Sequence, residues 1–423
     1  METLYTGSRG PYVKLVQSLL KRIGYDSGPV DGVFGSQTRQ AVIAFQMNNG
    51  LTPDGIVGPA TWRAFNTILR GYANYTVRPG DTYTSLARRF YTTVNAIITA
   101  NPGVDPNFLQ IGQTVVVPYG IDVVFTDIDY TYDIMEMNIR ALKARHPFLE
   151  TGVIGKSVMG KNIYYIRLGA GSHEVSYNGS HHANEWITSP FLMKFIENFL
   201  KAYVSRASIR GYDIAALWNR SSMYIVPMVN PDGVDLVLGA ISPDNPYYRN
   251  AVSLNRTGQP IPRVWKANIR GTDLNLNYPA GWERGVEYER SLGTTGPGPA
   301  NYGGPAPLSE PETLAMAEFT RRHSFTLAIA FHTQGEVIFW QYLDLAPPEA
   351  LPIAERFSRI NGYAVLTNPP EASFGGYKDW FIQEYRRPGY TFEVGRGVKP
   401  IGTEQFNTIY NQNEGVLLEA SVI

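Results

Sequence analysis

The feature that most constrains the fold is an alternation of apolar, strand-like runs with longer helical stretches over residues 124–423. The strand-like runs are short and rich in β-branched and aromatic residues, as in SMYIVPMVN, FTLAIAFH and YTFEVG. Helical stretches such as SPFLMKFIENFLKAYV and PETLAMAEFTRRH are interspersed with them. Because strands that alternate with helices form sheets covered by helices, these residues predict one large α/β domain.

Two smaller blocks precede this domain. In residues 1–68, apolar side chains recur at helical spacing from Val13 to Ile23, and an Asp-Gly turn followed by Gly and Thr occurs twice. This pattern predicts a small helical bundle. Residues 74–119 begin with the strand-like YTVRPGD and end with QIGQTVVVP, with two short helical stretches between them, which predicts a βααβ module. Three domains suit a chain of 423 residues.

The composition limits the class of partner. The 37 Lys and Arg residues equal the 37 Asp and Glu residues in number. The chain therefore has no net positive charge that would attract nucleic acid or an anionic membrane. The sequence has no cysteine, which leaves His, Asp and Glu as the candidate metal ligands. No apolar run approaches the ~20 residues that span a bilayer, and the N-terminal METLYTGSRGPYVK lacks the pattern of a signal peptide. We therefore expect no nucleic-acid partner and no membrane insertion.

Three of the six histidines directly follow strand-like segments. One strand leads into His181, His182 and Glu185, and another ends at His332. The carboxyl ends of strands in open α/β sheets are where ligands collect, and two His with one Glu is a recurring catalytic zinc set. Either His181 or His182 is a candidate first ligand, but only His182 stands three residues before Glu185. His146, His173 and His323 fit no such pattern.

Five motifs of residues 124–423 resemble the zinc carboxypeptidase family in order and rough separation: HHANEW, VNPDGV, GTDLNLNYP, FHTQG and YTFEVG. The resemblance implies an α/β/α domain with a mixed central sheet and one Zn²⁺ per chain. It implies that the metal is bound by His182, Glu185 and His332. It also implies that Glu393 is the general base and acid, and that Asp273 is the carboxylate that orients His182.

The two smaller blocks also resemble known modules. Residues 1–68, with DGVFGSQTRQAVIAFQ and GLTPDGIVGPATW, are similar to the peptidoglycan-binding domain of bacterial wall hydrolases. Residues 74–119, ending in ANPGVDPNFLQIGQTVVVP, look like a LysM module, whose relatives bind glycans that contain N-acetylglucosamine. The expected partners are therefore the glycan and the stem peptides of peptidoglycan.

A developing oxyanion needs a cation or a strong hydrogen-bond donor. The family places an arginine upstream of the Asp-Leu-Asn motif, and WKANIRG offers two candidates in this chain, Lys266 and Arg270. The sequence does not choose between them.

The sequence departs from the family at the positions that would contact substrate. Leu276 follows Asn275 where the carboxypeptidases have an arginine that grips the C-terminal carboxylate of a peptide, and leucine cannot replace its paired hydrogen bonds. The tyrosine expected before Gly-Gly is also missing from the neighbourhood of residues 370–372. After Gly-Gly, Tyr377 or Lys378 takes the position that tunes side-chain preference, and Lys378 is a candidate partner for an acidic substrate group.

These features predict a zinc metallopeptidase that hydrolyses the γ-D-glutamyl bond to diaminopimelate or another diamino acid in wall stem peptides. The alternatives are a zinc carboxypeptidase that trims other wall or nutrient peptides, and a wall-binding protein with an inactive peptidase domain. The expected location is the bacterial cell wall or the spore. Synthesis in the cytoplasm of a mother cell with release by lysis is one route that the sequence leaves open, beside retention in the cell and a non-standard export route. The sequence does not indicate an oligomeric state.

Overall fold

The computed structural model describes residues 2–367 and 374–423, and the chain divides into two compact units. The first unit comprises Met1–Leu149 with Glu197–Ala207, and the second comprises Glu150–Ile196 with Ser208–Ile423. No helix among the described residues is both long enough and apolar enough to cross a membrane.

The N-terminal part of the first unit is a three-helix bundle of α1 (Pro11–Arg22), α2 (Ser36–Asn48) and α3 (Pro59–Leu69). Two buried glutamines fix its repeated Asp-Gly turns. Gln17 donates from Nε2 to Asp31 Oδ1 (3.0 Å), and Gln46 donates in the same way to Asp54 (2.8 Å). Each glutamine also accepts the N–H of the glycine that follows the aspartate. The sequence repeat is therefore a repeat of one buried hydrogen-bonded turn.

The predicted βααβ order is present in the next part of the first unit. Strands β1 (Tyr72–Thr76) and β2 (Thr114–Pro118) pair in antiparallel fashion, and α4 (Tyr83–Arg89) and α5 (Val94–Ala100) lie between them in sequence. Their shared core consists of Val77, Tyr83, Leu86, Ala87, Ile97, Val115 and Val117.

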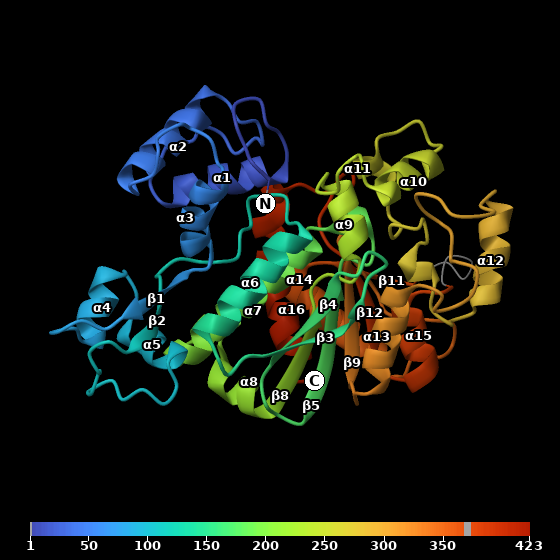
Figure 1. Cartoon of the computed structure of the whole chain (residues 1–423). Coiled ribbons are helices and arrows are strands. Elements are labelled where there is room, and N and C mark those ends of the chain that lie inside the picture. The colour runs from blue at the N-terminus through green and yellow to red at the C-terminus, as the bar shows by residue number, and fades with distance from the viewer. Residues whose placement is uncertain (1, 368–373) are drawn as a thin grey trace. The chain divides into compact units, whose positions relative to one another are not determined.

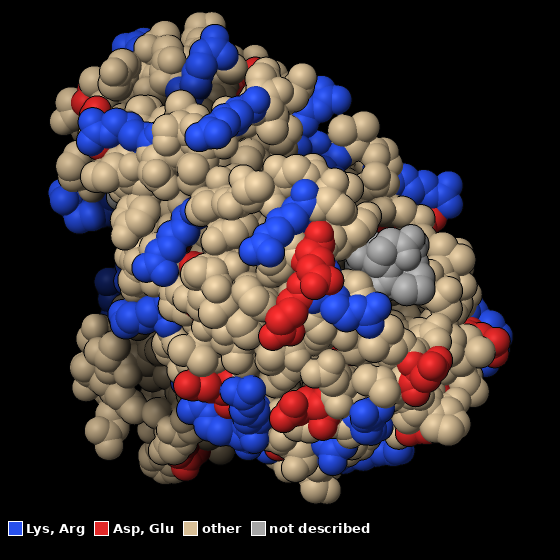
Figure 2. Space-filling view, turned by 90° about the vertical axis from the view of Figure 1, so that its right-hand side faces the viewer, with Lys and Arg blue, Asp and Glu red and all other residues tan. Residues whose placement is uncertain are grey.

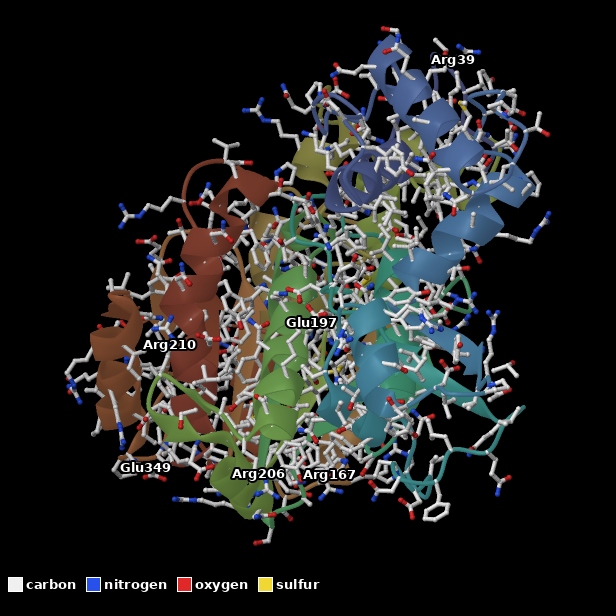
Figure 3. The ribbon with its side chains drawn as sticks, turned by 90° about the vertical axis from the view of Figure 1, so that its left-hand side faces the viewer. Arg39, Arg167, Glu197, Arg206, Arg210 and Glu349 are labelled. Carbon is white, nitrogen blue, oxygen red and sulfur yellow. The ribbon has the colours of Figure 1, made fainter. Side chains whose placement is uncertain are left out.

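Helix α6 (Tyr132–Arg145) also belongs to the first unit. Glu197, labelled in Figure 3, is buried within the same unit and accepts the backbone N–H of Val123 at 2.7 Å.

The second unit is built on a mixed eight-stranded sheet in the order β11-β10-β12-β9-β5-β8-β4-β3 (Figure 1). The pairs β12/β9, β9/β5, β5/β8 and β10/β11 are parallel, and the others are antiparallel. The strands are β3 (Glu150–Lys156), β4 (Asn162–Leu168), β5 (His173–Gly179), β8 (Ser221–Val226), β9 (Leu327–His332), β10 (Val337–Phe339), β11 (Ala364–Leu366) and β12 (Gly389–Glu393).

Helices cover both faces of this sheet. Side chains of α13 (Pro311–Arg321) and α15 (Tyr377–Tyr385), including Met316 and Trp380, share a core with Ala328 and Ala330 of β9. On the other face, backbone carbonyls of α16 (Phe406–Ala420) and α14 (Ala350–Asn361) accept hydrogen bonds from the hydroxyls of Tyr177 and Tyr390, respectively. The structure confirms the predicted α/β fold with a mixed central sheet.

The remaining elements complete the chain. The further helices are α7 (Thr188–Ser205), α8 (Ile214–Arg220), α9 (Pro231–Val237), α10 (Pro246–Leu254), α11 (Ile261–Val264), α12 (Trp282–Ser291), α13 (Pro311–Arg321), α14 (Ala350–Asn361), α15 (Tyr377–Tyr385) and α16 (Phe406–Ala420). A short hairpin is formed by β6 (Ser208–Ile209) and β7 (Tyr212–Asp213). Arg210 at its turn, labelled in Figure 3, pairs with Glu414 of α16 at 2.9 Å.

Acidic and basic side chains lie among one another on the face drawn in Figure 2, and most of that face carries neither. This distribution agrees with the equal numbers of acidic and basic residues in the sequence.

Candidate active site

The carboxyl ends of β5 and β9 bring the candidate metal ligands together. These strands are parallel neighbours, with Gly179 of β5 opposite Phe331 of β9. His182 and Glu185 follow β5 across a single 3-10 turn (Ala183–Glu185), and His332 is the last residue of β9. One ligand atom from each of the three residues lies within 4.8 Å of the other two, and all three side chains are buried.

The donor atoms of this cluster suit a divalent metal. Nδ1 of His182 is 3.0 Å from Glu185 Oε1, and Nδ1 of His332 is 2.9 Å from Glu185 Oε2. The two Nδ1 atoms are 3.1 Å apart. Two imidazole nitrogens and one carboxylate that converge in this way form the three-ligand set of catalytic zinc sites, which keep a fourth position open for water.

Asp273 fixes the tautomer of His182. Its Oδ1 atom is 3.0 Å from His182 Nε2, which directs the Nδ1 lone pair of the imidazole into the cluster. Burial acts to raise the pKa of Asp273, but the contact with His182 and the charge of Lys266 outweigh burial and hold this pKa well below its ordinary value. The carboxylate is therefore ionised when it accepts the imidazole N–H.

The structure separates the two adjacent histidines. His181 Nε2 is 2.9 Å from the hydroxyl of Tyr278, in a fully buried position. Burial and the neighbouring His332 and His182 keep the pKa of His181 well below its ordinary value, so its ring is neutral. Of the two alternatives left open by the sequence, His182 is the one grouped with Glu185 and His332.

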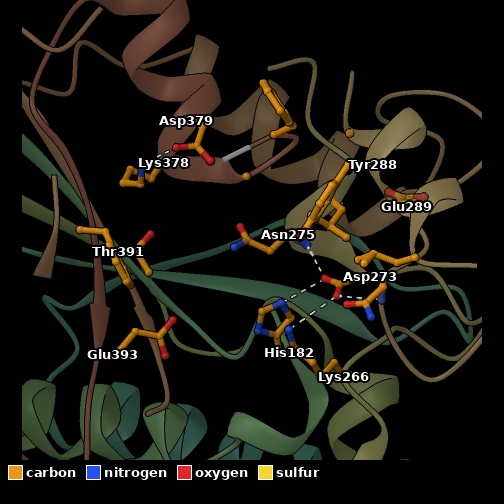
Figure 4. Close-up of a pocket in the computed structure, with 17 residues that line it drawn as sticks. His182, Lys266, Asp273, Asn275, Tyr288, Glu289, Lys378, Asp379, Thr391 and Glu393 are labelled. Atoms are coloured by element: carbon orange, nitrogen blue, oxygen red, sulfur yellow. Dashed lines mark hydrogen bonds and ion pairs between the residues drawn. The ribbon is translucent and has the colours of Figure 1, made fainter. Parts of the chain in front are cut away.

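Glu393 is the last residue of β12, whose parallel pairing with β9 places it directly opposite His332. Its side chain lines a pocket of about 310 Å³ together with His182 (Figure 4). Burial and the nearby Glu185 carboxylate raise the pKa of Glu393, while the ammonium of Lys399 acts to lower this pKa. A carboxylate with a raised pKa beside a metal cluster is suited to accept and return a proton.

The two candidate cations lie in different surroundings. Lys266 lines the pocket, with Nζ 3.8 Å from Asp273 Oδ2. Arg270 lies in a tight turn in which the N–H of Gly271 donates to the carbonyl of Asn268, and its Nη1 is 3.6 Å from Glu310. The Arg270 side chain is 52% exposed and does not line the pocket. The structure thus brings Lys266, and not Arg270, to the site.

The predicted substrate-contacting residues, Asn275, Leu276 and Lys378, all line this pocket. Asn275 Oδ1 accepts the N–H of Tyr377 at 3.0 Å, which leaves the NH₂ group of its amide to donate. Leu276 adds an apolar side chain to the wall. Lys378 is 3% exposed and donates to the carbonyl of Gln341 at 2.7 Å. The positions in the region where a capping tyrosine was expected, residues 370–372, lie outside the described residues.

Sequence reasoning missed three charged groups of the site. Lys399, in the loop after β12, has Nζ 2.5 Å from Glu185 Oε1. Asp379 pairs with Lys378, and Glu289 of α12 lines the same pocket. No motif marks these residues, although Asp379 is the direct neighbour of a predicted one. The Lys399 contact depends on the path of a loop, which leaves no periodic pattern in the sequence.

Comparison with known proteins agrees with this geometry. The family model "Zinc carboxypeptidase" matches residues 135–414, "Putative peptidoglycan binding domain" matches residues 9–65 and "LysM domain" matches residues 75–118. Gamma-D-glutamyl-L-diamino acid endopeptidase 1 of Lysinibacillus sphaericus is 41% identical over 394 residues, which cover 81% of this chain and 98% of that protein. Protein YqgT of Bacillus subtilis (strain 168) is 35% identical over 294 residues, covering 69% of this chain and 77% of that protein.

Solved structures share the fold at low sequence identity. Carboxypeptidase A from Helicoverpa armigera aligns with a TM-score of 0.52 and 17% identity, over 97% of this chain and 94% of that chain. Thrombin activatable fibrinolysis inhibitor aligns with a TM-score of 0.52 and 19% identity, over 69% of this chain and 72% of that chain. With the family model matched across the whole metal cluster and Glu393, the chain belongs to the zinc carboxypeptidase family and is a zinc metallopeptidase that carries peptidoglycan-binding and LysM domains.

Proposed function

We propose that this metallopeptidase hydrolyses the amide bond between the γ-carbonyl of D-glutamate and the amine of a diamino acid in peptidoglycan stem peptides. The observation that carries the proposal is Leu276, an apolar residue in the wall of a pocket that retains the metal cluster and Glu393. Without a guanidinium at this position, the pocket lacks the paired hydrogen bonds with which the carboxypeptidases hold a C-terminal carboxylate. An internal amide bond is therefore the better substrate.

Two further findings support the same substrate. The peptidoglycan-binding and LysM domains are suited to hold the wall polymer, so that even weak binding by each domain gives a high local concentration of stem peptide. The relative from Lysinibacillus sphaericus, which matches this chain over 98% of its own length, is named for the γ-D-glutamyl-diamino acid bond.

The chemistry divides among the described side chains. Zn²⁺ supplies Lewis acidity for the scissile carbonyl and acidifies water when it is held by His182, Glu185 and His332. Glu393 takes a proton from the attacking water and delivers it to the leaving amine. The water oxygen becomes part of the new γ-carboxylate, and the amine leaves with the proton that Glu393 returns.

Two pocket residues assist the transfer. Lys266 offers its ammonium to the oxyanion, and its separation of 3.8 Å from Asp273 keeps it at the edge of the metal site. Asn275, whose oxygen is engaged by the N–H of Tyr377, presents its amide N–H donors to the substrate backbone.

Digestion of purified muropeptides with and without a chelator tests the proposal. Mass spectrometry should show chelator-sensitive cleavage at the γ-glutamyl bond, with release of the diamino acid portion as one fragment. Release of single terminal residues alone would identify a carboxypeptidase instead. No hydrolysis by zinc-loaded protein, together with unchanged wall binding by Glu393→Gln, would identify a wall-binding protein.

The peptidoglycan-binding and LysM domains support an association with the bacterial cell wall. A spore location stays a prediction. Immunofluorescence of vegetative and sporulating cells checks it, and an even signal on vegetative walls would contradict it.

A further inference from the structure

Asn268 closes the turn that follows Lys266 in the pocket wall. Its side chain is fully buried, and its Oδ1 atom accepts the N–H groups of Arg270 at 3.0 Å and Thr272 at 3.1 Å. The backbone N–H of Asn268 also donates to the carbonyl of Thr272 at 2.8 Å. These three hydrogen bonds hold the turn closed around one side chain.

The amide nitrogen of Asn268 connects this turn to a helix. Nδ2 donates to Glu310 Oε2 at 2.7 Å and to Glu312 Oε2 at 3.3 Å. Glu310 directly precedes α13, Glu312 lies in the first turn of that helix, and both side chains are buried. The amide therefore uses all four of its hydrogen-bonding positions, two toward the turn and two toward α13.

Helix α13 gives the turn a rigid support. Met316 of this helix packs in one core with Ala328 and Ala330 of β9, and β9 ends at the metal ligand His332. The helix that anchors Asn268 is thus packed on the strand that carries one of the metal ligands. A turn tied to this helix keeps a fixed position relative to the metal cluster.

The backbone of Lys266 is held on two sides, but its side chain is not. Its N–H donates to the carbonyl of Pro299 at 2.8 Å, and its carbonyl accepts the N–H of Ala183 at 2.9 Å. The side chain is 29% exposed, and Nζ lies 3.8 Å from Asp273 Oδ2, on the same side of the pocket as His182 (Figure 4). Because lysine is a point charge on a flexible stem, its backbone must be fixed if the ammonium is to reach one place.

The connection to α13 is more than the turn requires. An asparagine or aspartate that closes a turn needs only its side-chain oxygen. In Asn268 that oxygen serves the turn, and the N–H donors reach Glu310 and Glu312 instead. Only the amide satisfies both sides, because a carboxylate would place an oxygen against two carboxyl groups.

We propose that Asn268 is a positioning residue for the oxyanion: by tying the turn to Glu310 and Glu312, it holds Lys266 where the ammonium meets the developing charge. Asn268 does not line the pocket and acts only through Lys266. This inference rests on the oxyanion role of Lys266 in the proposed function.

Asn268→Asp tests the connection, because it keeps the oxygen that closes the turn and replaces only the N–H donors. The substrate is a stem peptide that extends beyond the diamino acid, and the enzyme is full-length and zinc-loaded. A misplaced catalytic group by about 1 Å can cost 10²-fold, so we expect kcat to fall about tenfold and KM to change less than about threefold. Zinc content should stay at one ion per chain. Unchanged kcat would overturn the proposal.

A double-mutant cycle separates positioning from a general loss of structure. If Asn268 acts through Lys266, Asn268→Asp should lower kcat less than about twofold once Lys266→Ala has removed the ammonium. Independent losses that multiply in the double variant would overturn the positioning role alone. Unchanged kcat in Lys266→Ala would overturn the oxyanion role of Lys266 and the positioning role together. The proposed function fails separately, if the wild-type enzyme leaves the γ-glutamyl bond intact.

A compensating variant keeps the test decisive if Asn268→Asp folds poorly. Asn268→Asp/Glu310→Gln exchanges donor and acceptor across the bond of 2.7 Å. Burial raises the pKa of Glu312 to about 7, so this neighbour can hold a proton beside the new carboxylate. We expect kcat within about threefold of the wild-type value. A folded double variant without recovered kcat would overturn the proposal.

Asn138 of the first unit provides the matched control. It is also fully buried, donating to the carbonyl of Val123 at 2.8 Å and accepting from the hydroxyl of Tyr130 at 2.6 Å. Asn138→Asp should lower the melting temperature but leave kcat unchanged. A matching fall in kcat would show that any new buried charge has this effect, and would overturn the special role of Asn268.

Discussion

The two walls of the pocket are built in different ways. The metal wall consists of residues at the carboxyl ends of adjacent parallel strands, so the ladder between β5, β9 and β12 sets the positions of its ligands. The far wall forms where the turn at Leu274–Leu276 packs on the start of α15, through contacts between residues about 100 apart in sequence. Pairing between strands thus sets the positions of the metal ligands and Glu393. Packing between distant segments sets the shape of the wall that faces the substrate.

The largest loss of activity is expected from a substitution in the metal wall. Glu393→Gln removes the group that we propose accepts and returns the proton, and general acid and base catalysis contributes typically 10² to 10⁴-fold. We expect kcat for γ-glutamyl cleavage of a stem peptide that extends beyond the diamino acid to fall by about 10³-fold, with zinc content unchanged at one ion per chain. Product formation by liquid chromatography and metal content by atomic absorption check these outcomes.

A fall in zinc content would instead make Glu393 a structural member of the cluster. Removing zinc from the wild-type enzyme with a chelator should abolish activity, and added Zn²⁺ should restore it. Activity that survives complete removal of the metal would contradict the role of the cluster.

The next largest loss of activity is expected from Lys266, the cation beside Asp273 that lies between the two walls. Loss of one oxyanion donor typically costs 10² to 10³-fold in kcat, so we expect Lys266→Ala to lower kcat by about 10²-fold with a smaller change in KM. Arg270→Ala is the matched control because its side chain is exposed and pairs with Glu310. It should change kcat by less than about twofold, since exposed ion pairs contribute little. Equal losses in the two variants would remove the distinction that the structure draws.

A smaller effect, on zinc affinity, is expected from Asp273, the carboxylate that orients the metal ligand His182. Asp273→Asn replaces the carboxylate 3.0 Å from His182 Nε2 with an amide. Loss of such an outer partner typically weakens metal affinity by 10 to 100-fold. Competition with a fluorescent chelator measures this affinity, and circular dichroism verifies that the fold is intact. Unchanged zinc affinity would show that the ladder alone holds His182 in place.

The difference between the walls also explains what the sequence predicts. His182, Glu185 and His332 were candidates because they follow or end strand-like segments, and the family resemblance implied that they form one ligand set. The role of Glu393 was implied by the resemblance alone. The structure groups the three candidate ligands and places Glu393 in the same pocket as His182. The βααβ order and the mixed sheet followed from periodicity and from the resemblance. The partners of Lys378 were not predictable, because Gln341 lies 37 positions away and only the folded chain brings its carbonyl to the ammonium. The choice between Lys266 and Arg270 likewise depends on the direction of a turn between Asn268 and Gly271.

The smallest change, and the one most specific to the far wall, is expected from Leu276→Arg. An arginine here would place a guanidinium fork in the pocket beside Asn275, where it can form paired hydrogen bonds with a terminal carboxylate. We expect a low but measurable release of C-terminal residues from short peptides, with a few-fold loss of γ-glutamyl cleavage. Leu276→Met is the matched control, since it keeps an apolar side chain of similar volume and should leave both activities unchanged. If Leu276→Arg releases no terminal residue, the leucine is only a packing residue, and the missing arginine does not explain which substrates the pocket accepts.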